Sequence, residues 1–295
     1  MKLHLHGAGG LNFRYARSIT KYYAKSFYLC TLLLSKQKRW ATYAVYGLCR
    51  YVDNIVDSPR ARSREEVLAE IRHVESELRI AYREGESQHP VIQPFSVAAQ
   101  KYKIPMEYAL DLLKGVLMDT EKNRYQTFDE LYVFCYRVAS VVGLMMTPVL
   151  GYSNPTALVY AEKLGIAMQL TNILRDVLED KNAGRIYFPQ DEMKRFGVTD
   201  EDILAERPTP QFLEMMKFNI DRARKYYQES EPGIAMLDKE SQFAIYAASA
   251  IYSGILGKLE ARGCDPFPGR VFVPKGKKIR ILLGELLRTR IFGKG

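Results

Sequence analysis

The sequence has few of the features that mark metal-thiolate, disulfide-stabilised or membrane-spanning proteins. Its four cysteines lie far apart and form no CxxC pair, which argues against a zinc site and a disulfide framework and predicts buried free thiols. No run approaches the roughly 18 uninterrupted apolar residues of a membrane span. The N-terminal MKLHLHGAGGLNFRY lacks the apolar centre of a secretory signal. We therefore expect a cytoplasmic chain that does not cross a membrane.

Alternating apolar runs are also nearly absent, and RVFV at 270–273 is the only strand-like stretch. Apolar residues recur instead every three or four positions, which predicts helices throughout. The segment 63–84 is typical, because a Ser63/Glu66 capping box precedes a one-sided apolar pattern. Helix breakers cluster at 85–94, 152–155, 183–189, 206–210 and 263–274, and none of these clusters is long enough for a domain linker.

These patterns predict one all-α domain over 1–295 with a substantial core, since 47% of its residues are hydrophobic. Residues 1–12 are expected to form a flexible tail. Residues 275–295 read as a basic amphipathic helix. Such a helix suits peripheral contact with an anionic membrane, or it packs on the core with its charges in solvent.

The chain carries 43 lysines and arginines against 34 acidic residues, a net charge of +9 with a pI of about 9.2. This balance favours an anionic partner: nucleic acid, acidic lipid or a phosphorylated substrate. No nucleic-acid-binding module is recognisable and the basic residues are dispersed, so nucleic acid is not expected as a partner.

Two groups of polar residues recur at helical spacing and form two stripes on predicted helix faces. The first stripe lies in YGLCRYVDNIVD and the second in QLTNILRDVLED, where the intervening residues are mostly apolar. Because apolar residues flank each stripe, we expect the stripe to lie beside the core and its carboxylates to line a cavity. The first stripe consists of Tyr46, Arg50, Asp53 and Asp57, and the second of Gln169, Asn172, Asp176 and Asp180.

Like charges four residues apart destabilise a helix, and more so when they are partly buried. A hard cation would remove this repulsion, and carboxylate and amide oxygens suit Mg²⁺ rather than zinc. Solvated acidic faces remain the alternative for either stripe alone. The predicted metal ligands are Asp53, Asp57, Asn172, Asp176 and Asp180, with Arg50 and Arg175 alongside for an anionic ligand.

The sequence resembles the squalene/phytoene synthase family at both motifs, DNIVD and NILRDVLED. The resemblance extends to KSFYLCTLLL, to 115–125, and to FCYRVASVVGLMM, GRIYFP and RVFVPKGKK, so it covers nearly the whole chain. It departs at Phe134, where many relatives have tyrosine, and at Ser140, where they have glycine. The resemblance implies an all-α isoprenoid synthase fold around a central apolar cavity, with the two motifs facing each other at its mouth.

The resemblance also implies roles for individual residues. Asp53, Asp57, Asp176, Asp180, Tyr46 and Arg50 would be catalytic, with two or three Mg²⁺ ions. The substrate diphosphate would be bound by Lys25, Ser26, Arg50, Gln169, Arg175, Tyr252 and Arg270. The cavity would be lined by Thr31, Phe134, Val138 and Val142.

The implied reaction is a head-to-head condensation of two isoprenyl diphosphates through a cyclopropylcarbinyl diphosphate. We expect two geranylgeranyl diphosphates to give phytoene, because the small Thr31 would leave room for a C20 chain. NADPH is not expected, since the GAGG at 7–10 follows no strand and fails the dinucleotide-binding spacing. Two alternatives stay open: condensation of farnesyl diphosphate to a C30 product, and a non-catalytic membrane-associated assembly factor on the same fold. The sequence does not specify the oligomeric state.

Overall fold

The computed structural model describes residues 8–57 and 63–291, and the side chains of residues 13–56 and 63–288. Throughout this part of the chain the regular structure is helical, and its only β feature is an isolated antiparallel bridge between Tyr152 and Leu237. The predicted all-α class is therefore confirmed, while the strand-like 270–273 forms no strand. The helices are α1 (Ala8–Tyr23), α2 (Lys25–Cys30), the 3₁₀ turn η1 (Thr31–Leu33), α3 (Lys36–Asp57), α4 (Arg64–Glu84), α5 (Ile92–Tyr102), α6 (Met106–Glu121), α7 (Phe128–Cys135), the π-helical η2 (Tyr136–Ser140), α8 (Val141–Leu150), α9 (Ala157–Arg175), α10 (Val177–Asn182), α11 (Gln190–Phe196), α12 (Asp200–Leu204), α13 (Pro210–Ala235), α14 (Lys239–Glu260) and α15 (Lys275–Ile291).

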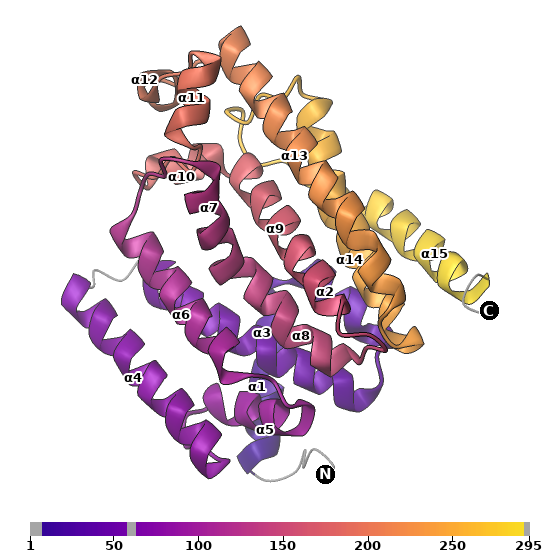
Figure 1. The fold of residues 1–295 in the computed structure, drawn as a ribbon. Helices are drawn as coiled ribbons and strands as arrows, with labels where there is room; N and C mark the ends of the chain where they lie inside the picture. Colours follow the sequence, from indigo (N-terminus) through magenta and orange to yellow (C-terminus); the bar gives the residue numbers. More distant parts are fainter. Residues whose placement is uncertain (1–7, 58–62, 292–295) are drawn as a thin grey trace.

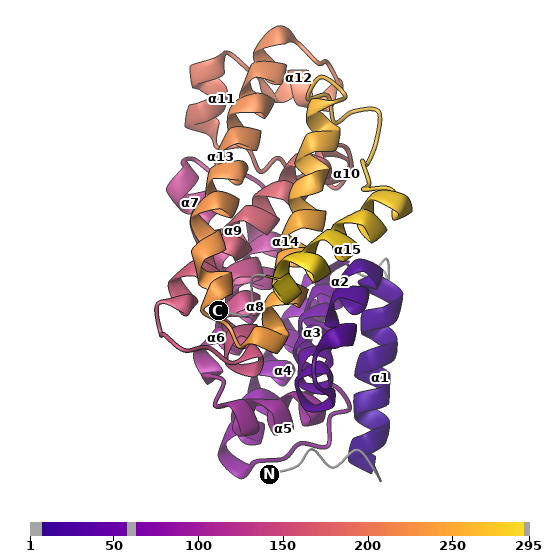
Figure 2. The same ribbon diagram turned by 90° about the vertical axis from the view of Figure 1, so that its right-hand side faces the viewer.

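The long helices form an elongated bundle with α9 at its centre (Figure 1). Helix α9 packs against α13, α14, α8 and η2, while α3 packs against α1, α5, α6 and α8. Helix α15 crosses the outside of α14 (Figure 2). Two clusters of buried apolar side chains result, one around α3 and one around α9 and α13. The first predicted stripe, on α3, thus lies beside one cluster, and the second, at the end of α9, lies beside the other.

Local sequence signals account for several helix ends. Ser63 accepts a hydrogen bond from the Glu66 amide and completes the predicted capping box of α4, which Gly85 ends in a left-handed conformation. Helix α1 begins at Ala8, so residues 8–12 are helical where a flexible tail was expected, and 1–7 lie outside the described residues. All four cysteines are buried and free, as predicted.

One continuous helical run, Phe128–Leu150, is long and apolar enough to cross a membrane by length and composition. More than half of its most apolar window is buried inside the protein, as in the core helix of many soluble proteins. The run includes the π-helical turn η2, and such turns often occur at functional sites. Here α9 comes so close that a Cβ on Gly165 would lie 2.4 Å from the Ser140 Cα. The Ser140 hydroxyl donates to the Glu162 carbonyl of α9 at 2.8 Å, so the side chain at this position has a structural role.

Candidate active site

A cavity of about 940 Å³ lies between α2, α3, the α7–α8 run, α9, α14 and the 270–273 segment. Its volume is at the upper end of the range for small-molecule sites. Most of its wall is apolar, with Val116, Met146, Leu164, Met168 and Ile251 among the lining residues. Charged side chains from both predicted stripes also line it. The cavity therefore combines a long apolar space with an ionic region, as an amphiphilic substrate requires.

The second stripe is broken where the sequence predicted a single helix. Helix α9 ends at Arg175, Asp176 has φ −105° and ψ 15°, and α10 starts at Val177. The Asp180 amide still donates to the Asp176 carbonyl at 2.8 Å, so both side chains remain on the cavity side. The break changes the direction of the chain without separating the two carboxylates.

Asp176 is held between two arginines. Arg175 and Arg270 each donate from Nε to Oδ1 and from Nη2 to Oδ2, over distances of 2.6–2.7 Å. Burial raises the pKa of Asp176, but the hydrogen bonds from Arg175 and then Arg270 outweigh it and leave the pKa below its ordinary value. Asp176 is thus an ionised carboxylate whose two oxygens are already engaged.

Asp180 lies in a different electrostatic environment. Burial, followed by the charge of Asp176, raises the pKa of its carboxyl to about 7. Arg185 and Arg270 oppose the rise but do not cancel it. A half-buried carboxyl that ionises near neutral pH is a group that a cation would stabilise strongly.

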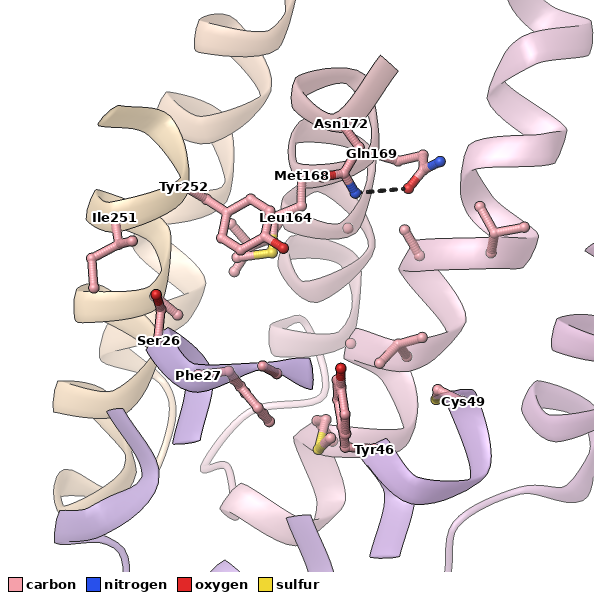
Figure 3. A pocket seen from close by; sticks show the side chains of 18 of the residues that line it. Ser26, Phe27, Tyr46, Cys49, Leu164, Met168, Gln169, Asn172, Ile251 and Tyr252 are labelled. Atoms are coloured by element: carbon pink, nitrogen blue, oxygen red, sulfur yellow. Dashed lines mark hydrogen bonds between the residues drawn. The ribbon is translucent and has the colours of Figure 1, made fainter. Parts of the chain in front are cut away.

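The first stripe lies on the uninterrupted helix α3, so its helical spacing is confirmed. Tyr46, Arg50 and Asp53 line the cavity, and Tyr46 projects from α3 into it (Figure 3). The Arg50 guanidinium stacks over the Tyr23 ring at 4.4 Å, and its buried Nε has no hydrogen-bond partner. Asp57 ends the helix, and its side chain lies outside those that the structure describes. Arg50 therefore offers an unused donor inside the cavity, which suits an anionic ligand.

Gln169 and Asn172 project from α9 into the same cavity (Figure 3). The Asn172 Nδ2 donates to the Gln169 Oε1 at 3.2 Å, whereas the buried Asn172 Oδ1 has no partner. An orphaned amide oxygen beside carboxylates is the donor set that Mg²⁺ prefers. The residues present therefore fit magnesium, although no three His, Cys, Asp or Glu side chains in the described residues already form a closed metal-binding group.

Most of the other predicted site residues also line the cavity. Ser26 and Tyr252 face it from α2 and α14 (Figure 3). Lys25, Arg175, Arg270, Phe134, Val138 and Val142 line it as well. Phe134 stacks on Tyr187 with ring centroids 5.3 Å apart, so its ring is part of an aromatic wall. The cavity thus contains the predicted diphosphate-binding set together with three of the four predicted wall residues.

Thr31 is the exception, because it does not line the cavity. It is 1% exposed in η1, donates to the Tyr28 carbonyl at 2.8 Å and lies 3.3 Å from the Tyr43 hydroxyl. Tyr28 and Tyr43, whose rings stack on each other, are thus the direct neighbours of the Thr31 hydroxyl. The expectation that a small Thr31 enlarges the cavity directly is therefore wrong for this structure.

A hydrogen-bonded cluster of Asp119, Arg185 and Tyr187 lines the cavity next to the second stripe, and the sequence analysis did not single it out. Asp119 accepts hydrogen bonds from both the Arg185 guanidinium and the Tyr187 hydroxyl. Arg185 and Tyr187 belong to the GRIYFP segment and Asp119 to 115–125. In the sequence, the only indication of this cluster was that both segments resemble the squalene/phytoene synthase family.

Known proteins match this chain over nearly its whole length. The squalene/phytoene synthase family matches residues 20–277. A phytoene synthase of Arthrospira platensis is 38% identical over 95% of this chain and 94% of its own, and the 15-cis-phytoene synthase of Synechocystis is 37% identical over 93% and 84%. The crystal structure of a dehydrosqualene synthase superposes with a TM-score of 0.88 at 31% identity, covering 95% of this chain and 97% of that one. The chain belongs to the squalene/phytoene synthase family, the head-to-head prenyltransferases whose chemistry on prenyl diphosphates depends on magnesium.

Proposed function

We propose that this enzyme condenses two molecules of geranylgeranyl diphosphate head to head into phytoene, for carotenoid biosynthesis. The observation that carries the proposal is the single cavity that combines an apolar wall with both carboxylate stripes and the arginines Arg50, Arg175 and Arg270. The curated relatives that share 36–41% of its residues are phytoene synthases, whereas the dehydrosqualene synthase shares 31%. Similarity therefore favours the C40 product over the C30 alternative.

We assign the magnesium ligands to Asp53 and Asp57 on one side of the cavity and to Asn172, Asp176 and Asp180 on the other, for two or three ions. When bound, magnesium would neutralise the diphosphate leaving group and position its oxygens. The buried, unpartnered Asn172 Oδ1 and the raised pKa of Asp180 support this assignment. The ions would lie in the part of the cavity that Asp53, Asp176 and Asp180 line.

The protein's own cations would hold the diphosphate groups. Arg50, Arg175 and Arg270 offer forked donors that match phosphate oxygens, and Lys25, Ser26, Gln169 and Tyr252 lie around the same space. Cleavage of one allylic carbon–oxygen bond leaves diphosphate on these donors and an allylic cation in the apolar part. The ring faces of Tyr46, Phe134 and Tyr187 can stabilise that cation while the apolar wall excludes water.

The cation then alkylates a double bond of the second substrate and gives a cyclopropylcarbinyl diphosphate. A second ionisation, rearrangement and loss of a proton produce the conjugated hydrocarbon without a reductant, so NADPH is not required. A reductive C30 reaction is the competing hypothesis. The non-catalytic assembly factor is disfavoured, because such a protein has no need for an unpartnered donor, Arg50 Nε, and an unpartnered acceptor, Asn172 Oδ1, inside a largely apolar cavity.

The decisive experiment incubates the purified chain with Mg²⁺ and either geranylgeranyl or farnesyl diphosphate, with and without NADPH, and identifies the hydrocarbon by mass spectrometry. We expect phytoene from the C20 substrate, no dependence on NADPH, and loss of product with EDTA.

Asp53→Asn should lower kcat by about a hundredfold or more, because each 1.36 kcal/mol lost at the transition state is tenfold in rate. Asp221→Asn, an exposed aspartate on α13, is the matched control. A C30 product alone, or normal turnover of Asp53→Asn, would overturn the assignment.

A further inference from the structure

The end of the cavity farthest from the carboxylates is built from the ends of several helices. Its lining comes from the last turn of α8, the first turn of α9, the last turn of α13, the first two turns of α14 and the α13–α14 connection. None of these lining residues is charged, and most of them are buried. Because Thr31 does not line the cavity, this end is the part of the wall that a long chain would meet. The set, which we call the cavity floor, consists of Thr147, Leu150, Ala157, Ile234, Leu237 and Ile245.

Lys38, near the start of α3, contacts both turns that carry the cavity floor. Its ammonium donates to the Leu150 carbonyl at 2.6 Å and to Asp238 Oδ2 at 2.7 Å. Glu240 Oε1 lies 2.9 Å from the same ammonium, and Ser241 Oγ lies 3.3 Å from it. The Lys38 side chain is only 12% exposed. One cation thus ties the end of α8 to the start of α14.

The two turns also bond directly to each other at one end of the bundle (Figure 1). The Ser241 hydroxyl donates to the same Leu150 carbonyl at 2.6 Å, and the Asp238 amide donates to the Gly151 carbonyl at 3.0 Å. Gly151 has a φ of 77°, and a Cβ there would lie 2.1 Å from Asp238 Oδ2, so only glycine leaves room for that carboxylate. We call Lys38, the Leu150 carbonyl, Asp238 and Ser241 the Lys38 clamp.

Helix α3 fixes the distance between the Lys38 clamp and the first stripe. Asp53 follows Lys38 by 15 residues on this unbroken helix, which is about 22 Å at roughly 1.5 Å per residue. Helix α9 gives the same depth, because Asn172 of the second stripe follows Ala157 of the floor by 15 residues. An extended C20 chain spans about 19 Å and a C15 chain about 14 Å, at about 1.25 Å per carbon–carbon bond. The depth therefore suits a C20 chain, whereas a C15 chain would end well short of the floor.

We propose that the Lys38 clamp sets the length of the isoprenoid chain that this enzyme accepts, by holding the cavity floor at a fixed distance from the carboxylates. The inference rests on the proposed function, because only a substrate with a long apolar chain would reach the floor. Lys38 itself does not line the cavity, so it is a positioning residue that acts through Leu150 and Leu237. Without its charge, the two turns would lose a shared partner and could separate, which would deepen the cavity.

A purely stabilising ion pair is the competing explanation, and the contacts of Lys38 argue against it. Its acidic partners Asp238 and Glu240 are 51% and 43% exposed, and ion pairs to exposed carboxylates contribute little to stability. The contact that reaches inward is the one to the backbone carbonyl of Leu150, whose side chain is 4% exposed and lines the cavity. Removal of the charge should therefore alter the position of the floor more than the stability of the fold.

The test measures kcat/KM of the full chain with Mg²⁺ for C15, C20 and C25 isoprenyl diphosphates, with the hydrocarbons identified by mass spectrometry. Lys38→Met keeps the apolar stem and removes the charge. We expect its ratio of kcat/KM for the C25 over the C20 substrate to rise roughly tenfold, the discrimination that small changes of an apolar pocket give. Its kcat for the C20 substrate should change by less than about threefold, because no contact to the reacting atoms is lost.

Three further variants make the test specific. Lys38→Arg can restore the bonds to both turns and should return the ratio to the wild-type value. Ser241→Ala removes the other donor to the Leu150 carbonyl, so it should shift the ratio in the same direction by a smaller factor. Lys163→Met is the matched control, because Lys163 joins α9 to Glu229 of α13 without lining the cavity. It should leave the ratio unchanged.

A ratio that neither Lys38→Met nor Ser241→Ala changes would refute the proposal. A loss of activity that is equal for all three substrates would refute it as well, because that is the effect of a merely stabilising contact. Ser241→Ala keeps the test decisive if Lys38→Met fails to fold. The wild type separates the two proposals: a preference for the C15 substrate would overturn the proposed function, whereas the Lys38 clamp is judged by the shift toward longer chains between wild type and variant.

Discussion

The two carboxylate stripes have similar spacing in the sequence and different environments in the folded protein. The stripe on α3 lies on one unbroken helix, and Asp53 is half-buried at the cavity. The second stripe crosses a helix break, and its Asp176 is 8% exposed between two arginines. Sequence spacing therefore identifies which helix face carries the oxygens, whereas residues distant in sequence decide how those oxygens are engaged.

The difference bears on how the site accommodates a metal. Asp176 is neutralised by Arg175 and Arg270 before any cation arrives, while the pKa of Asp180 is raised by burial and by Asp176 itself. Of the two arginines, Arg175 has 17% of its side chain exposed and Arg270 has 42%. Arg270 is thus the more exposed partner, and we expect it to be the one that moves away if the proposed metal and diphosphate require the Asp176 oxygens.

The largest effect is expected for Asp176→Asn in the metal-free protein. Loss of the carboxylate leaves Arg175, whose side chain is only 17% exposed, without its counter-charge, which should lower the free energy of unfolding by about 3 kcal/mol. Asp53→Asn should change the same quantity by less than about 0.5 kcal/mol. Denaturant unfolding in EDTA measures both. Equal destabilisation by the two variants would mean that the stripes do not differ as described.

The positions of the helices, and the helix faces that carry the site's carboxylates, were predictable from local sequence, because both depend on short-range spacing. The capping box at Ser63 and the faces that carry Asp53 and Asp176 are examples, and the structure confirms them. The break at Asp176 was not predictable, since QLTNILRDVLED reads as one continuous amphipathic pattern. Nothing in that pattern indicates the pairing with Arg270, which lies 94 residues away.

Side-chain packing explains why the expectation that Thr31 lines the cavity was wrong. The sequence gives the size of a side chain but not what fills the space beside it, and here Tyr28 and Tyr43 occupy that space. The cluster of Asp119, Arg185 and Tyr187 was not predicted from the sequence for a different reason. Its members come from separate segments, so only the fold brings them together.

A smaller effect of opposite sign is expected for Asp180→Asn. In unfolded chains an aspartate ionises near pH 4, whereas in the folded protein Asp180 retains its proton up to about pH 7. The native state therefore binds more protons between these values, and its stability falls as pH rises through this window. Asp180→Asn should remove that slope and raise the free energy of unfolding at pH 8 by about 2 kcal/mol, a shift of roughly 4 °C or more in Tm.

Thermal unfolding in EDTA at several pH values between 4 and 8 checks this prediction against the wild type. The informative quantity is the difference between the two proteins, because other groups titrate equally in both. If the stability of the two proteins changes with pH in the same way, the fold does not raise the pKa of Asp180. The contrast with Asp176→Asn would then reduce to a difference in arginine pairing alone.

The smallest effect is expected for Arg270→Gln, which separates the metal-binding role of Asp176 from its ion pairs. In the wild type, Arg270 holds both oxygens of Asp176, so an Mg²⁺ ion bound by Asp176, as we propose, would compete with Arg270 for them. The variant should therefore bind Mg²⁺ up to about tenfold more tightly in the absence of diphosphate, or about 1.4 kcal/mol. It should bind inorganic diphosphate more weakly, since it has lost a forked donor.

Titration calorimetry measures both affinities. The matched control is Arg224→Gln, because Arg224 is paired with Glu260 away from the cavity. Unchanged or weaker Mg²⁺ binding in Arg270→Gln would mean that the metal does not require the Asp176 oxygens that Arg270 holds.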